Sequence, residues 1–265
     1  MVKLQGLFFG LATLVLVAAA TFFFTKDWLP PLKSDRGGID HSIWITLAVT
    51  GAVFILTNLL LAWFSWRYTD RPGAQAAYWH DSPRLEWTWT LVTAAIMFAF
   101  LFNALGLWAQ ITRAAPDGAF VVEVTGQQFA WNVRYPGKDG IFGRTDPRLV
   151  DPAALNFIGL DKNDPSAADD IILPQNQLYL PEGRPVRVLI RSLDVIHSFF
   201  LPNFRVKQDA MPGMTVETWF TPKEAGDYEI ACAEHCGLGH YRMRGQVHVV
   251  PANEYDAKLD AAFAQ

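Results

Sequence analysis

Three long apolar blocks occupy the first 112 residues, and a different pattern follows them. The blocks cover residues 5–24, 42–66 and about 87–111, and each has about the length of a helix that crosses a lipid bilayer. Tryptophans lie towards the ends of the second and third blocks, as they commonly do at membrane surfaces. The pattern therefore predicts a multi-pass transmembrane region over residues 1–113.

The first block has two interpretations. It carries no charge, follows Lys3 and contains a run of alanines, so it also resembles a signal peptide. We favour a retained helix, either as a span or lying outside the other two. Three arginines lie in the loop between the second and third blocks. The positive-inside rule then places Met1 and this loop in the cytoplasm, and everything after Arg113 outside. The expected location is a bacterial-type plasma membrane, with the C-terminal domain on the periplasmic side.

From Phe120 onward the hydrophobic positions alternate with polar ones, which is typical of strands with one buried face. The alternating sets are Phe129, Trp131, Val133 and Tyr135; Val186, Val188 and Ile190; Val216, Thr218 and Phe220; Tyr228, Ile230 and Cys232; Val247 and Val249. We expect an antiparallel sandwich or barrel over residues 114–250. Residues 136–176 are rich in Gly, Pro, Asp and Ala and predict a long excursion between strands, to which we assign no function. A tail over 251–265 should contain a short helix.

A twelve-residue stretch carries the chain's most informative chemistry. It places Cys232, Cys236, His240 and Met243 close together, with Glu234 between the cysteines. Thiolate, imidazole and thioether groups together form a ligand set that selects copper. A disulfide between the two cysteines is the alternative, because an exported domain would permit one. A disulfide alone gives no reason for His240 and Met243 to follow at this spacing, so we favour a copper site.

The pattern Cys-x-Glu-x-Cys-x-x-x-His-x-x-Met resembles the binuclear copper (CuA) loop of cytochrome c oxidase subunit II. That family has a further histidine in a segment Asp-Val-x-His-Ser-Phe, and this chain has Asp194-Val195-Ile196-His197-Ser198-Phe199. The resemblance extends over about residues 42–250. It implies a fold of membrane α plus all-β class, in which N-terminal transmembrane helices precede a cupredoxin-like Greek-key β-sandwich or barrel.

The resemblance also implies a role for each ligand. His197 and His240 would each bind one copper through a ring nitrogen, and the two thiolates would bridge both metals. Met243 would be a weak axial ligand, and Glu234 would bind through its backbone carbonyl. The side chain of Glu234 would then be free for a Mg or Mn ion shared with subunit I. A closed shell of protein ligands leaves no position for a substrate, which indicates electron transfer at this metal.

Two further segments resemble the family. The sequence Leu85-Glu86-Trp87-Thr88-Trp89-Thr90 is similar to Leu-Glu-x-x-Trp-Thr, whose glutamate lies at the mouth of a proton-uptake channel formed with subunit I. Glu86 is therefore a candidate for proton uptake. The alternative is a solvated carboxylate at the membrane surface, which costs little at the end of a helix.

The second is Gly126-Gln127-Gln128-Phe129-Ala130-Trp131, which is similar to Gly-His-Gln-Trp-x-Trp. The first tryptophan of that motif accepts the electron from cytochrome c in the family. Here Phe129 takes its position, so the electron donor could couple differently. For Trp131, a place in the core and a place on the electron path both stay open.

These resemblances imply an electron-accepting subunit of a haem-copper terminal oxidase. It would receive electrons from cytochrome c at CuA and pass them to haem in subunit I, where oxygen is reduced to water as protons are translocated. The outer part carries fourteen Lys and Arg against twenty Asp and Glu, a net charge of −6 that could steer a basic donor.

Two alternatives stay open: the CuA subunit of a nitric oxide reductase, and a copper-delivery module. We expect no haem in this chain because it lacks a Cys-x-x-Cys-His motif, and no nucleic acid partner. The expected partners are subunit I, other membrane subunits, the electron donor and the lipid bilayer.

Overall fold

The computed structural model describes residues 2–26, 28–68, 71–173 and 176–263. The chain divides into two compact units. The first comprises the chain up to Leu29 together with Gly38–Trp108, and the second comprises Pro30–Gly37 together with Ala109 to the C-terminus.

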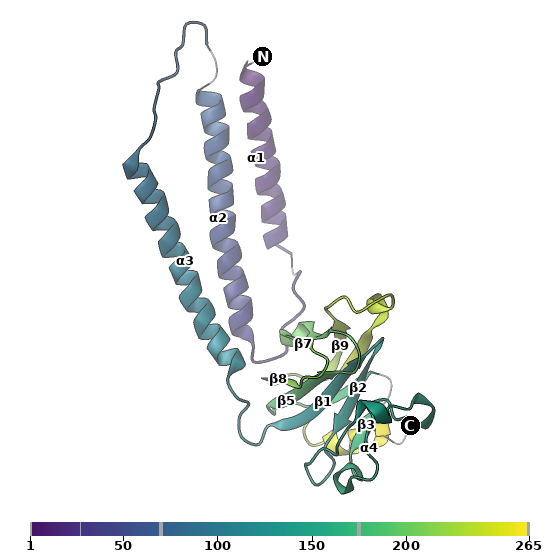
Figure 1. Ribbon diagram of the computed structural model, residues 1–265. Coiled ribbons are helices and arrows are strands. Elements are labelled where there is room, and N and C mark those ends of the chain that lie inside the picture. The colour runs from purple at the N-terminus through teal and green to yellow at the C-terminus, as the bar shows by residue number, and fades with distance from the viewer. Residues whose placement is uncertain (1, 27, 69–70, 174–175, 264–265) are drawn as a thin grey trace. The chain divides into compact units, whose positions relative to one another are not determined.

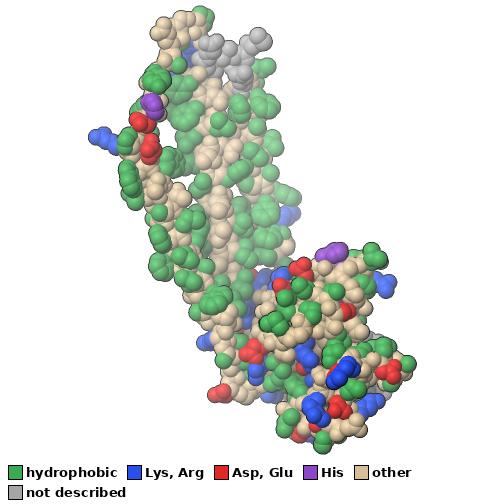
Figure 2. All heavy atoms as spheres, viewed as in Figure 1, with side chains coloured by type: hydrophobic (Ala, Val, Ile, Leu, Met, Phe, Trp, Pro, Cys, Tyr) green, Lys and Arg blue, Asp and Glu red, His purple; other side chains and the backbone are tan. Residues whose placement is uncertain are grey.

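The first unit contains the predicted spans as three helices, α1 (Val2–Phe24), α2 (Gly37–Arg67) and α3 (Pro83–Thr112) (Figure 1). All three are long and apolar enough to cross a membrane. Their hydrophobic side chains face outward (Figure 2), as a lipid solvent requires. The three predicted spans are confirmed, whereas Met1, placed above in the cytoplasm, lies outside the described residues.

The second unit contains two five-stranded sheets (Figure 1). One sheet has the order β3-β2-β1-β5-β8, and the other has the order β4-β10-β9-β6-β7. The strands are β1 (Phe120–Gln127), β2 (Ala130–Tyr135), β3 (Ile171–Leu173), β4 (Gln177–Pro181), β5 (Val186–Ser192), β6 (His197–Leu201), β7 (Val206–Ala210), β8 (Val216–Phe220), β9 (Gly226–Cys232) and β10 (Arg244–Val250). A short helix, α4 (Tyr255–Phe263), follows, and the last two residues of the predicted tail lie outside the described part.

The core lies between the sheets and includes most of the alternating positions that the sequence indicated, whereas Phe129, Val216, Thr218, Tyr228 and Cys232 are only half-buried. Trp131, Val133, Val188 and Ile190 are fully buried. The prediction of an antiparallel sandwich is wrong for two strand pairs, because β1 pairs with β5, and β4 with β10, in parallel. Hydrophobic alternation has the same period in both kinds of ladder, so it could not distinguish them.

The excursion over residues 136–176 is more ordered than its composition suggested. It contains three short 3₁₀ turns and ends in the edge strand β3, which pairs with β2. Each turn begins at an Asp-Pro pair, where Asp146, Asp151 or Asp164 accepts a hydrogen bond from the backbone N–H two residues later. Aspartate and proline thus act as cap and first helical residue.

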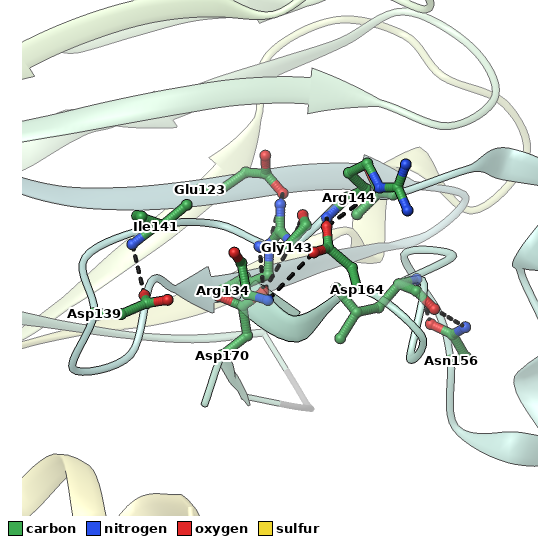
Figure 3. A network of polar contacts seen from close by, with 12 residues as sticks. Glu123, Arg134, Asp139, Ile141, Gly143, Arg144, Asn156, Asp164 and Asp170 are labelled. Carbon is green, nitrogen blue, oxygen red and sulfur yellow. Dashed lines mark hydrogen bonds and ion pairs between the residues drawn. The ribbon is translucent and has the colours of Figure 1, made fainter. Parts of the chain in front are cut away.

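Arg134 fastens this excursion to the sheet from a buried position (Figure 3). Its guanidinium lies 2.9 Å from a carboxylate oxygen of Glu123 and 3.0 Å from one of Asp170, and it donates to the Gly143 carbonyl at 2.8 Å. Arg191 contributes a further contact of 3.4 Å to Glu123. The excursion is therefore held by a buried network of charges, together with a small apolar cluster of its own formed by Ile158, Leu160 and Ala167.

The segment Pro30–Gly37 packs on the strand-rich unit, which the sequence did not indicate. The backbone N–H of Lys33 donates to the Asn203 carbonyl at 2.7 Å, and the Ser34 hydroxyl donates to the Phe204 carbonyl at 2.8 Å. The Asp35 carboxylate accepts a hydrogen bond from the Thr221 backbone at 3.0 Å. The linker between the first two helices is thus part of the outer domain.

Candidate metal centre

Strand pairing brings together two distant parts of the sequence. β6 and β9 are antiparallel neighbours, with Phe199 opposite Cys232. His197 is the first residue of β6, and Cys232 is the last residue of β9. Because the two strands run in opposite directions, these two ends meet at the same edge of the sheet. The loop that follows β9 then folds back there through a 3₁₀ turn over His240–Arg242.

The side chains of the predicted ligands converge at this edge. Donor atoms of His197, Cys232 and Cys236 all lie within 4.8 Å of one another. His197 Nδ1 is 4.0 Å from Cys232 Sγ, and the two sulfurs are 3.8 Å apart. On the other side, Cys236 Sγ lies 3.6 Å from His240 Nδ1 and 3.7 Å from Met243 Sδ. The group therefore has a thiol pair in its middle and one histidine on each side.

This donor set fits copper. Both cysteines are free, and a sulfur separation of 3.8 Å is far too long for the disulfide that the sequence left open. Burial, with the neighbouring Cys232 as the second cause, raises the pKa of the Cys236 thiol to about 11. Two thiolates so close together need a cation between them, and soft sulfur with imidazole ligands suits copper.

Residues around the group fix its orientation. His197 is fully buried, and its Nε2 lies 2.8 Å from an Asp194 carboxylate oxygen, which leaves Nδ1 directed at Cys232. Burial acts to raise the pKa of Asp194, but hydrogen bonds from the Gln128 backbone, the His197 ring and the Val195 backbone outweigh it and hold that pKa below its usual value. Asp194 thus stays ionised and holds the imidazole in place.

Two other contacts were not assigned from the sequence. The Gln128 side chain donates to the Cys236 carbonyl at 2.5 Å, which ties the candidate copper loop, residues 233–243, to the segment between β1 and β2. At Gly126 an added Cβ would lie 2.8 Å from the His197 ring and 3.1 Å from Trp131, so only glycine fits. Both residues lie in the aromatic motif, which was the only sequence signal for them.

The remaining predicted site residues lie around this group or, for Glu86, in the helical unit. The Trp131 ring is buried edge-on against His197, with ring centres 5.9 Å apart. Phe129 packs on the copper loop, where a Cβ at Gly239 would come within 2.4 Å of its ring. Glu234 directs its carbonyl to the site, 3.1 Å from Cys232 Sγ, while its side chain is exposed.

Glu86 lies in the first turn of α3, in the helical unit, and is exposed.

The sequence was compared with known proteins. Residues 120–250 match the family model described as cytochrome c oxidase subunit II, periplasmic domain. The alternative cytochrome c oxidase subunit 2 of Bradyrhizobium diazoefficiens is 39% identical over 248 residues, which cover 93% of this chain and 88% of the relative. This chain belongs to the cytochrome c oxidase subunit II family. It is therefore a membrane-anchored subunit of a haem-copper terminal oxidase with a cupredoxin-like periplasmic domain.

Further relatives and solved structures are similar at lower identity. The cytochrome c oxidase subunit 2 of Cereibacter sphaeroides is 30% identical over 229 residues, which cover 82% of this chain and 73% of the relative. Among solved structures, the periplasmic domain of subunit II of cytochrome oxidase from Bradyrhizobium japonicum is 30% identical, with a TM-score of 0.41, over 56% of this chain and 96% of that one. A mixed-disulfide intermediate between a thioredoxin-like protein and subunit II of cytochrome c oxidase is 29% identical, with a TM-score of 0.40, over 58% of this chain and 96% of that one.

Proposed function

We propose that this subunit accepts electrons from cytochrome c at a binuclear copper centre and passes them to haem in subunit I. The ligands would be His197, Cys232, Glu234, Cys236, His240 and Met243. The supporting observation is the paired arrangement of donors, with the two sulfurs 3.8 Å apart and a histidine nitrogen beside each. When bound, the copper pair supplies one-electron redox chemistry.

The protein's part in that chemistry is to keep the ligands still. His197 and Met243 are fully buried, and Cys236 is 3% exposed, so water has little access to their donor atoms. Asp194 orients one histidine, and the Gln128 amide holds the loop that carries Cys236. Fixed ligands in a dry site change little between redox states, which favours fast electron transfer.

We propose that electrons reach the copper pair by a path through Phe129 and Trp131. Trp131 contacts His197, and Phe129 lies against Gly237 and Gly239 of the copper loop. The two rings therefore connect the ligands to β2 and to the segment that precedes it. The net charge of −6 on the outer part would steer a basic donor towards this domain.

We make a further proposal for each of two exposed carboxylates. Glu86, exposed at the start of α3, would take up protons together with subunit I. The exposed side chain of Glu234 would hold a Mg or Mn ion shared with subunit I. The positive-inside pattern supports a bacterial plasma membrane with the copper domain outside. The division into residues 1–113, 114–250 and 251–265 stays our proposed one, with Pro30–Gly37 packed on the second part.

The test is substitution of one thiol in the full oxidase. Cys236→Ser should abolish the near-infrared absorption of the mixed-valence copper pair, lower bound copper below two atoms per subunit and stop turnover with cytochrome c. Tyr241→Phe, an exposed change within the same loop, serves as the control and should leave all three unchanged. A Cys236→Ser protein that kept the spectrum and full activity would refute the copper assignment.

The two alternatives can also be tested. The relatives are named as cytochrome c oxidase subunits, which favours oxygen over nitric oxide as the acceptor. Family membership likewise favours an oxidase subunit over a free copper-delivery module. Purification of the native chain should therefore bring with it a haem-containing subunit that consumes oxygen, and nitric oxide consumption in its place would favour the reductase.

A further inference from the structure

A pair of arginines lies where the outer domain joins the membrane helices. Arg36 directly precedes α2, and Arg113 directly follows α3, so the chain itself places both beside the ends of apolar helices. Both guanidiniums lie over the ring of Trp219 on β8, at 5.8 Å for Arg36 and 5.1 Å for Arg113. One aromatic side chain thus gathers the two cations that flank these apolar helices in the chain.

Hydrogen bonds fix this group. The Trp219 indole N–H donates to the Arg113 carbonyl at 2.8 Å, and the Arg36 guanidinium donates to the Trp219 carbonyl. Trp219 is 7% exposed and Arg36 is 8% exposed, whereas the Arg113 side chain is exposed. The group therefore presents one accessible guanidinium, and a second one adds positive charge from within the fold.

The positive charge of this group is only partly compensated. Within the described part of the chain, neither guanidinium forms an ion pair with a carboxylate. Asp35 lies near Arg36, but its carboxylate accepts the backbone N–H of Thr221. By contrast Arg187, the cross-strand neighbour of Trp219, is paired with Glu217. Arg36 and Arg113 therefore contribute positive charge beside the chain positions at which two apolar helices begin and end.

We propose that Arg36, Arg113 and Trp219 form a binding site for the phosphate of an anionic phospholipid headgroup. The planar guanidinium of Arg113 matches phosphate oxygens with two parallel N–H groups, and Arg36 strengthens the attraction. The indole ring occupies the interfacial position that tryptophan favours. The site would hold the outer domain against the membrane surface and does not depend on the copper centre.

The test measures lipid retention by native mass spectrometry on the full chain purified in detergent. The chain is titrated with phosphatidylglycerol, which is anionic, or phosphatidylcholine, which is zwitterionic. Phosphatidylglycerol should bind in preference. Arg113→Gln and Arg36→Gln should each weaken its binding about fivefold, since a basic residue near an anionic lipid contributes about that factor. Arg113→Lys keeps the charge but loses the paired N–H groups, so its affinity for phosphatidylglycerol should lie between those of the unaltered chain and Arg113→Gln.

Arg187→Gln is the matched control, because it removes one positive charge beside the same tryptophan from a residue that already has an acidic partner. It should leave lipid retention unchanged. If Arg36→Gln does not fold, Arg113→Gln alone still tests the site, since that side chain is exposed.

Three results would overturn the proposal. The first is equal retention by Arg113→Gln and Arg187→Gln, or equal binding of the two lipids. The second is displacement by inorganic phosphate at the concentrations at which the lipid binds, which would indicate a site for the free ion. The third is unchanged lipid binding by the Arg113→Gln chain, together with loss of subunit I when the same variant is purified as a complex, which would assign the arginines to a carboxylate of a partner protein.

Discussion

Replacement of Arg134 by methionine should severely destabilise the outer domain. Methionine keeps much of the length of the side chain but removes the cation that compensates Glu123 and Asp170, whose side chains are 6% and 0% exposed. Removing one partner of a buried ion pair costs about 3–5 kcal/mol, because the other charge is left in a dry site. Arg191 near Glu123 and the Gly143 N–H on Asp170 remain, so the loss should stay within that range.

The assay is the urea dependence of amide hydrogen exchange in β1 of the full chain. Arg148→Met is the control, because this arginine also pairs with an aspartate, Asp146, but its side chain is 88% exposed. The control should leave the urea midpoint unchanged. If Arg134→Met shifts the midpoint no more than Arg148→Met does, the buried network does not hold the excursion in place.

The loss of stability in Arg134→Met should also depend on pH. Burial raises the pKa of Asp170 despite the opposing effects of the Gly143 N–H and Arg134. The folded state therefore binds this proton more tightly than the unfolded state, and ionisation of Asp170 costs stability as pH rises through its raised pKa. Without Arg134 that cost grows, so the deficit of Arg134→Met should be smaller at pH 5 than at pH 7.5. An equal deficit at both values would show that Asp170 is not the group responsible.

Three further predictions concern single contacts. Gly126→Ala should displace His197 or Trp131, because the added Cβ has no room; this should cost about 1–3 kcal/mol of stability, as in other overpacked sites, and alter the copper spectrum. Gly140→Ala is the control: Gly140 has open space around it but a positive φ, so the change should cost stability without altering the spectrum. Hydrogen bonds from the guanidinium of Arg148 and then from its backbone N–H lower the pKa of Asp146 to about 2. Arg148→Met keeps the backbone N–H, so carboxylate NMR should show this pKa rising part of the way towards 3.8, and no rise would exclude the guanidinium as a cause. After copper is removed with a chelator, Cys236 should react with iodoacetamide slowly until pH approaches 11, and rapid reaction at pH 8 would contradict the effect of burial.

The proposed copper ligands could be singled out from the sequence, by resemblance to the family and because five of the six lie within twelve residues. A turn of that length keeps its donors close together whatever the rest of the chain does, so spacing was informative there. The three helices could likewise be predicted from the sequence, since a bilayer requires a similar length and an apolar composition of every span. The predicted extents of 5–24, 42–66 and 87–111 differ from the helices mainly because polar ends continue beyond the apolar blocks.

The contacts that hold those ligands were decided by the tertiary structure. His197 reaches the thiols only because β6 pairs with β9, and the roles of Gly126, Gln128 and Asp194 depend on loops that meet at that sheet edge. For the same reason the sequence did not predict three other features: the parallel pairing of β1 with β5, the Arg134 network and the packing of Pro30–Gly37 on the outer domain. Hydrophobic alternation records which face of a strand is buried, whereas the identity of its neighbour depends on contacts between residues far apart in the chain.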